Sequence, residues 1–264
     1  MPQSKPPTLG TAVTKDVVVI EVGPERKKYY LHKALLVHHS DYFRKALEGP
    51  WTEAQEGVIK LEDIEPAVVN WFVHWLYTGT LPGYRDFKEE NRIFDSPIEG
   101  HMAKLKSYAF AERFLVPEFR KAVNENLVDD ISKEGYYIEV HQMLELVQEA
   151  FTTIPLDRPI LQLLVDVHCS LWTQCCEDDT ISVNKLPRAF LVRAMRTLHE
   201  ELRWERESAD EKKVYCYYEH ASDEEQKACP NQHMKYDAER DFGFFEERVT
   251  CYNCSGYEDS NSED

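Results

Sequence analysis

The sequence predicts an α+β fold, in which a cluster of helices is flanked by a small three-stranded sheet and followed by further helices and an acidic tail. Short runs of β-branched or aromatic residues predict three strands, at Val17–Val22, Lys28–Leu31 and Val58–Leu61. Between and after these strands, apolar residues recur at the spacing of amphipathic helices. Residues 201–264 carry 18 acidic against 8 basic residues, so they hold −10 of the formal net charge of −17.

The first two strands are expected to form a hairpin, with Tyr29 or Tyr30 facing the core. Two short helices should follow, and Ser40 is the expected N-cap of the second. Gly49 and Pro50 should end that helix, because glycine tolerates the left-handed C′ conformation and proline cannot continue the hydrogen-bond ladder. A polar loop then leads to the third strand.

The most apolar helix is expected after Glu65, because Pro66 suits the first helical turn and Gly79 suits the end. Its apolar residues are Val68, Val69, Phe72, Val73, Trp75 and Leu76. Burial of this helix is therefore central to the predicted fold. Five further helices are predicted at 101–114, 117–127, 138–151, 158–171 and 187–202. A polar surface insertion at 82–100 precedes them, and a hinge at 132–135 separates the second of them from the third.

The order and spacing of particular residues resemble the BTB/POZ domain. The positions that match the signature of this family are Asp16, His32, Leu36, Ser40, Tyr42, Phe43, Phe72, Leu76, Tyr77 and Gly79. A later helix pair matches the family pattern at Leu105, Tyr108, Ala111, Phe114, Val116 and Phe119. The resulting domain assignment is a disordered leader at 1–14, a BTB/POZ-like domain at 15–128, a helical extension at 129–205 and an acidic tail at 206–264.

The resemblance implies a protein-interaction module that acts as an adaptor or scaffold. Domains of this family self-associate or dock other proteins, and many are substrate adaptors for cullin-type ubiquitin ligases, so a homodimer and a cullin are the implied partners. The alternative is a transcription-associated BTB regulator without its own DNA-binding segment. The layout is also similar to that of BTB proteins of filamentous fungi. Asp16 and Lys33 resemble a charged pocket of the family. Alternatively, they form an ion pair that fixes the sheet against the first helices.

Composition and motifs exclude several other classes of protein. The strong negative charge would repel nucleic-acid phosphates, so no nucleic-acid partner is expected. The sequence shows no secretory signal and no apolar run of bilayer length, which predicts a cytoplasmic or nuclear protein without a membrane partner. It also lacks a glycine-rich phosphate loop and the common hydrolase motifs, so we do not expect an enzyme.

The tail contains thiol and imidazole groups at short spacings, of the kinds that zinc prefers as ligands. A C-x3-H pair is repeated after eight residues, and a C-x2-C pair comes later. The candidate ligands are Cys216, His220, Cys229, His233, Cys251 and Cys254. Two interpretations are open: a zinc ion bound by four of the six, or a flexible tail with free thiols.

Overall fold

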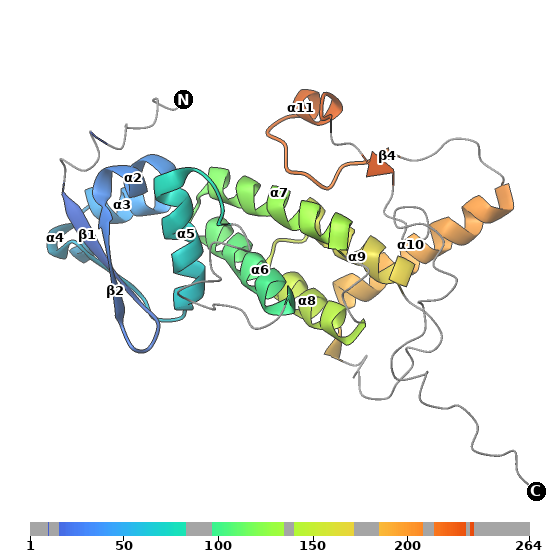
Figure 1. Ribbon diagram of the computed structural model, residues 1–264, viewed down its shortest axis with the longest axis horizontal. Coiled ribbons are helices and arrows are strands. Elements are labelled where there is room, and N and C mark those ends of the chain that lie inside the picture. The colour runs from blue at the N-terminus through green and yellow to red at the C-terminus, as the bar shows by residue number, and fades with distance from the viewer. Residues whose placement is uncertain are drawn as a thin grey trace, which may run out of the picture. The chain divides into compact units, whose positions relative to one another are not determined.

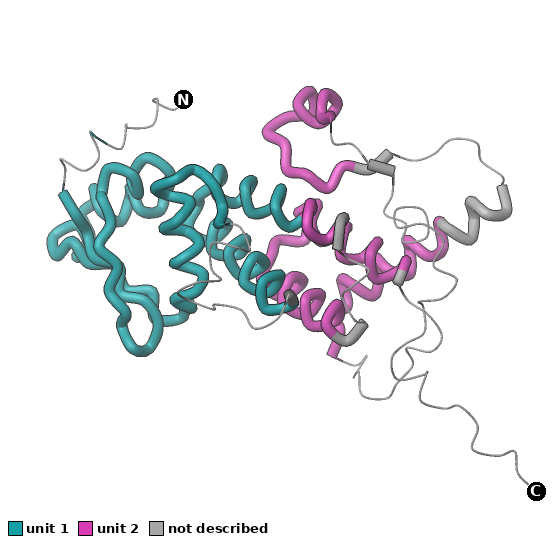
Figure 2. Tube along the Cα trace, viewed as in Figure 1, with its two compact units in different colours: residues 1–127 teal, residues 128–264 magenta. Residues whose placement is uncertain are grey.

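The computed structural model describes residues 10, 16–82, 97–134, 140–171, 185–207, 214–230 and 233–234. The chain divides into two compact units, residues 1–127 (unit 1) and residues 128–264 (unit 2), which are coloured separately in Figure 2. The predicted leader and the end of the tail lie outside the described residues, except for Gly10. None of the described helices is both long enough and apolar enough to cross a bilayer.

The predicted three-stranded sheet is confirmed in unit 1. The central strand β1 (Val17–Val22) pairs antiparallel with β2 (Lys27–His32) and parallel with β3 (Val58–Leu61). Figure 1 shows the hairpin of β1 and β2. Alternation along the strands buries one face, to which Val18, Ile20, Val22, Leu31, Ile59 and Leu61 contribute. Tyr29 is the tyrosine that faces inward, and its hydroxyl donates a hydrogen bond to Asn70 Oδ1 at 2.8 Å.

The predicted helices of unit 1 are all present, and the structure adds one short helix that was not predicted. The helices are α2 (Lys33–His39), α3 (Asp41–Glu48), α4 (Thr52–Glu56), α5 (Pro66–Thr78), α6 (Pro97–Arg113) and the first part of α7 (Pro117–Glu134). The expectation of a polar loop in place of α4 was wrong. Because α4 buries none of its residues, it has no apolar periodicity by which the sequence could reveal it.

Two glycines end helices for different reasons. Gly79 ends α5, as predicted, and lies in the left-handed region at φ 71°. For Gly49, the sequence predicted this left-handed conformation as well. The same prediction for Gly49 was wrong, because this residue is extended at φ −83° and ψ −177°. Glycine is needed there for space: a Cβ atom would collide with the carbonyl oxygen of Lys45 and with the ring of Trp51.

The core of unit 1 is a cluster of aromatic rings around α5. Phe72 is fully buried, and Trp71 and Leu76 are only 3% and 5% exposed, which confirms the predicted helix and its buried face. Ring centroids within 6.3 Å of that of Phe72 belong to Phe43, Trp75, Phe110 and Phe119.

Unit 2 is mainly helical, and its three predicted helices are confirmed. They are α8 (Val140–Thr153), α9 (Pro159–Leu171) and α10 (Arg188–Glu207), and α9 contacts both of the others. The hinge expected at 132–135 was wrong for residues 132–134, which continue α7. Val128 and Ile131 on this part of α7 are fully buried, and their burial favours a continued helix.

The predicted polar insertion falls mostly outside the described residues. Residues 83–96 of the predicted polar insertion are not described, and residues 97–100 belong to α6 instead of the insertion.

After α10, the chain forms a small antiparallel pair of strands, β4 (Val214–Tyr215) and β5 (His233–Met234), with the short helix α11 (Asp223–Lys227) between them.

Candidate functional site

The signature residues of unit 1 make specific hydrogen bonds that explain part of their spacing. His32 Nδ1 lies 2.7 Å from the hydroxyl oxygen of Tyr77, which also accepts a hydrogen bond from the His32 backbone N–H at 3.2 Å. Ser40 accepts a hydrogen bond from the backbone N–H of Phe43 at 2.9 Å and donates one to the carbonyl oxygen of Phe114 at 2.6 Å. These bonds join the end of β2 to α5, and the start of α3 to the end of α6.

The remaining signature residues contribute mostly to packing. Leu36, Phe43 and Phe72 are fully buried, and Leu76 is nearly so, whereas Tyr42 is 39% exposed. The second set of matching positions is also buried, at Leu105, Tyr108, Ala111, Phe114, Val116 and Phe119.

The proposed ion pair between Asp16 and Lys33 does not form. Asp16 is exposed, and its carbonyl oxygen accepts a hydrogen bond from the Lys33 backbone N–H at 2.9 Å. Their side chains make no ion pair in the part of the chain that the structure describes. This backbone bond connects the residue before β1 to the first residue of α2.

One face of the sheet leaves apolar side chains in contact with solvent. We call this the outer sheet face and define it by Val17, Val19, Tyr30 and Val58. The register places Val19 opposite both Tyr30 and Val58 on the neighbouring strands. Val17 is 50% exposed and Tyr30 is 66% exposed, so this face of unit 1 has apolar surface available for contact.

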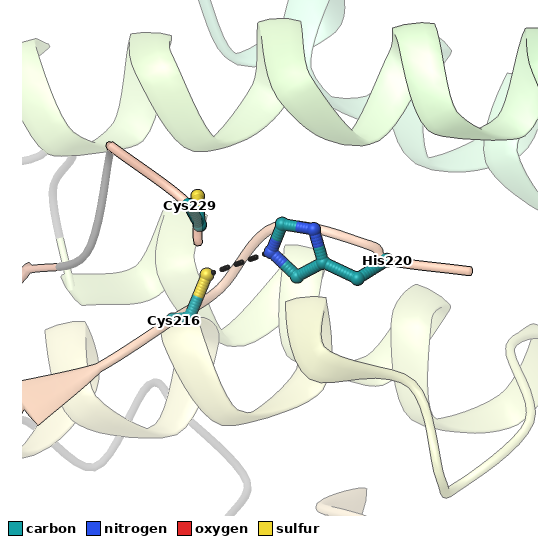
Figure 3. A group of neighbouring side chains, drawn as sticks. All are labelled: Cys216, His220 and Cys229. Carbon is teal, nitrogen blue, oxygen red and sulfur yellow. Dashed lines mark hydrogen bonds between the residues drawn. The ribbon is translucent and has the colours of Figure 1, made fainter. Parts of the chain in front are cut away.

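Three of the six predicted zinc ligands meet in unit 2. Cys216 follows β4, His220 comes four residues later, and Cys229 follows the end of α11. The Cys216 sulfur lies 3.1 Å from His220 Nε2, and one ligand atom from each of the three residues lies within 4.8 Å of the others. Figure 3 shows the two sulfur atoms and the imidazole ring side by side.

The two thiols influence each other. Burial raises the pKa of the Cys216 thiol, the backbone of Tyr218 lowers it through a hydrogen bond, and the neighbouring Cys229 thiol raises it further. Two adjacent thiolates repel each other, so a cation between them is needed to stabilise both in the ionised form.

The His220 ring has its second nitrogen on the side away from Cys216. This Nδ1 atom is buried and has no hydrogen-bond partner among the described residues. Glu225 Oε1 lies 3.8 Å from it, beyond the length of a hydrogen bond. The Glu225 carboxylate is fixed by the local fold, because its Oε2 accepts a hydrogen bond from the Ala221 backbone N–H at 2.8 Å.

Two tyrosines between Cys216 and His220 anchor this segment to the helices of unit 2. The Tyr217 hydroxyl donates a hydrogen bond to Asp166 on α9 at 2.8 Å, and the Tyr218 hydroxyl donates one to Asp129 on α7 at 2.7 Å. Tyr217 is 2% exposed and Tyr218 is 8% exposed. These anchors were not predicted from the sequence, although two adjacent tyrosines in a polar tail were a usable signal.

The other predicted ligands are only partly placed. His233 lies in β5, where its backbone pairs with that of Tyr215, the residue before Cys216. Cys251 and Cys254 lie outside the described residues. The described cysteines Cys169, Cys216 and Cys229 form no disulfide with one another.

Comparison with known proteins identifies the domain in unit 1. Residues 14–93 match the BTB/POZ domain family, so this chain contains a BTB/POZ domain, which is a protein-interaction module. Over 50 residues the chain is 40% identical to Kelch-like protein 30 of Mus musculus. The aligned segment spans 19% of this chain and only 9% of that relative. The similarity to BTB proteins of filamentous fungi stays a prediction.

Proposed function

We propose that this protein is an adaptor that docks a cullin-type ubiquitin ligase subunit through its BTB/POZ domain and presents another protein to the ligase. The observation that carries the proposal is the BTB/POZ domain at residues 14–93. The helices α8, α9 and α10 support it, since they follow the domain in the region where adaptors of this family extend the cullin contact.

The surface of unit 1 also favours a docking role. The outer sheet face exposes Val17 and Tyr30, and Trp51 at the start of α4 is 60% exposed. Aromatic residues contribute disproportionately to the binding energy of protein interfaces. An interface on these residues would bury apolar surface that the isolated domain leaves in water.

The experiment is size-exclusion chromatography with light scattering on the purified full chain, alone and mixed with a purified cullin. Alone, the protein should elute with a mass of 30.9 kDa, or of twice that value if it forms a homodimer. With cullin, the proposal predicts a complex whose mass is the sum of the two components. Separate elution at micromolar concentrations would contradict the cullin partner.

Surface variants test whether the BTB/POZ domain makes the contact. Trp51→Glu and Tyr30→Glu each replace an exposed aromatic side chain with a negative charge. A variant whose position lies in the interface should weaken the complex at least about tenfold, because aromatic residues in interfaces often contribute about 2 kcal/mol or more to binding. Tyr30→Phe is the matched control and should bind like the parent. Unchanged binding by both charged variants would exclude contact at these two positions.

A further inference from the structure

We propose that Cys216, His220 and Cys229 bind one zinc ion that holds the start of the tail onto the helices of unit 2. Zinc would be coordinated by the sulfur atoms of the two cysteines and by Nε2 of the histidine. Thiolate and imidazole ligands select zinc over magnesium and calcium, which prefer oxygen. This proposal is independent of the cullin proposal, because it concerns a different part of the chain.

The spacing of the three ligand atoms fits a tetrahedral site. Zinc–sulfur bonds of about 2.3 Å and zinc–nitrogen bonds of about 2.0 Å place tetrahedral ligands roughly 3.5–3.8 Å apart. Here the Cys216 sulfur and His220 Nε2 are 3.1 Å apart, and all three atoms lie within 4.8 Å of one another. Shifts of less than about an ångström therefore bring them to the distances that zinc requires.

The surroundings of His220 fit a metal ligand as well. An imidazole that binds zinc usually donates its second N–H to a carboxylate or a carbonyl group, which fixes the ring and its tautomer. His220 Nδ1 is buried without a hydrogen-bond partner in the described part of the chain, and Glu225 Oε1 lies 3.8 Å away. With zinc at Nε2, Nδ1 carries the proton, and a small rotation of Glu225 provides its acceptor.

The three described side chains leave one position of a tetrahedral zinc ion for a further ligand. A structural zinc site is closed by four protein ligands, and the described cluster supplies three. The β4–β5 pairing places the His233 backbone opposite Tyr215, next in sequence to Cys216. The charges of the two cysteine thiolates would balance that of the zinc ion, and His220 would bind as a neutral imidazole.

Zinc binding would also favour the burial of the two anchoring tyrosines. Tyr217 and Tyr218 lie between two of the ligands, and their hydroxyl groups bond to Asp166 and Asp129. Fixing both ends of this short segment lowers the entropy that the tyrosines lose when they are buried. Zinc binding and the docking of the tail onto unit 2 should therefore stabilise each other.

The primary test is the metal content of the full chain, purified without chelator and measured by inductively coupled plasma mass spectrometry. The expected result is about one zinc per chain. Reconstitution with cobalt(II) should give the visible absorption of a tetrahedral ion and a thiolate charge-transfer band. Less than about a tenth of an equivalent of zinc, together with no such cobalt spectrum, would overturn the proposal.

Paired variants separate ligand loss from general damage to the fold. Cys229→Ser should lose bound zinc and weaken the cobalt charge-transfer band, whereas Cys169→Ser on α9 should keep both. Glu225→Gln removes the negative charge beside His220 Nδ1 and should weaken zinc binding about 10–100-fold. Its control, Glu224→Gln, alters an exposed residue of α11 and should bind zinc normally.

The same measurements define the results that contradict the assignment. Full zinc content and an unchanged cobalt spectrum in Cys229→Ser would exclude Cys229 as a ligand and overturn the cluster. If Cys229→Ser fails to fold, His220→Gln decides, and full zinc content in that variant would overturn the proposed site.

Discussion

Phe72 in unit 1 and Tyr217 in unit 2 are both almost completely buried, but their environments differ. Phe72 lies among other aromatic rings and makes only apolar contacts through its side chain. Tyr217 is followed by polar residues, and its hydroxyl bonds to the buried carboxylate of Asp166. The first region is stabilised by apolar burial, whereas the second depends on polar anchors and, in our proposal, on a metal ion.

This difference determines how each region should respond to change. Apolar burial is distributed over many contacts, so only a large truncation at its centre should disrupt it. Polar anchors are few. Removing one side chain of such a hydrogen-bonded pair leaves the other, a buried charged or polar group, without its partner. The predictions below test this contrast, beginning with the largest expected effect.

Phe72→Ala should destabilise unit 1 by about 3–5 kcal/mol, because it removes the ring at the centre of the aromatic cluster and leaves a cavity. Urea unfolding followed by tryptophan fluorescence measures this change, since three of the five tryptophans lie in unit 1. Tyr30→Ala is the control and should change stability by less than about 0.5 kcal/mol. An unfolding midpoint for Phe72→Ala equal to that of the parent would contradict the apolar core.

Tyr217→Phe should destabilise the docked tail by about 1.5–3 kcal/mol, because it removes a hydrogen bond to a charged group and keeps the ring. Asp166 also accepts a hydrogen bond from Gln162 at 2.9 Å, which favours the lower end of this range. Limited proteolysis of the segment at 214–230 would measure the change. Cleavage no faster than in the parent would show that the hydroxyl does not anchor the tail.

The pH dependence of unit 2 should contain a contribution from His168, since burial lowers its pKa from 6.5 to about 4. Between these two pKa values the unfolded chain binds a proton at His168 more readily than the folded chain does. The contribution of His168 to stability is therefore fully present above pH 6.5 and is lost as the pH decreases. From pH 7 to pH 5 the loss should be about 2 kcal/mol.

His168→Gln should remove this part of the pH dependence, although it also lowers stability at pH 7 by disturbing the edge contact with Phe190. Urea unfolding of both proteins at pH 7 and pH 5 gives the comparison. Equal losses of stability in parent and variant would show that His168 does not titrate in this way.

The sequence predicted the fold of unit 1 well, because periodic apolar residues and N-cap and proline signals mark α3 and α5 locally. It could not predict α4, which buries nothing, or the extended conformation of Gly49, which depends on the positions of Lys45 and Trp51. In the tail, spacing alone gave six candidate ligands. Among the described residues, it is the fold that brings Cys229 beside Cys216 and His220 after an intervening helix.

The contrast between the two regions is tested most directly by hydrogen–deuterium exchange of the full chain, with and without a zinc chelator. Our account predicts that chelation accelerates exchange at residues 214–230 and leaves the amides of α5 unchanged. Equal exchange at 214–230 in the two conditions would contradict a metal-dependent tail, and equal acceleration in α5 would contradict the independence of the aromatic core.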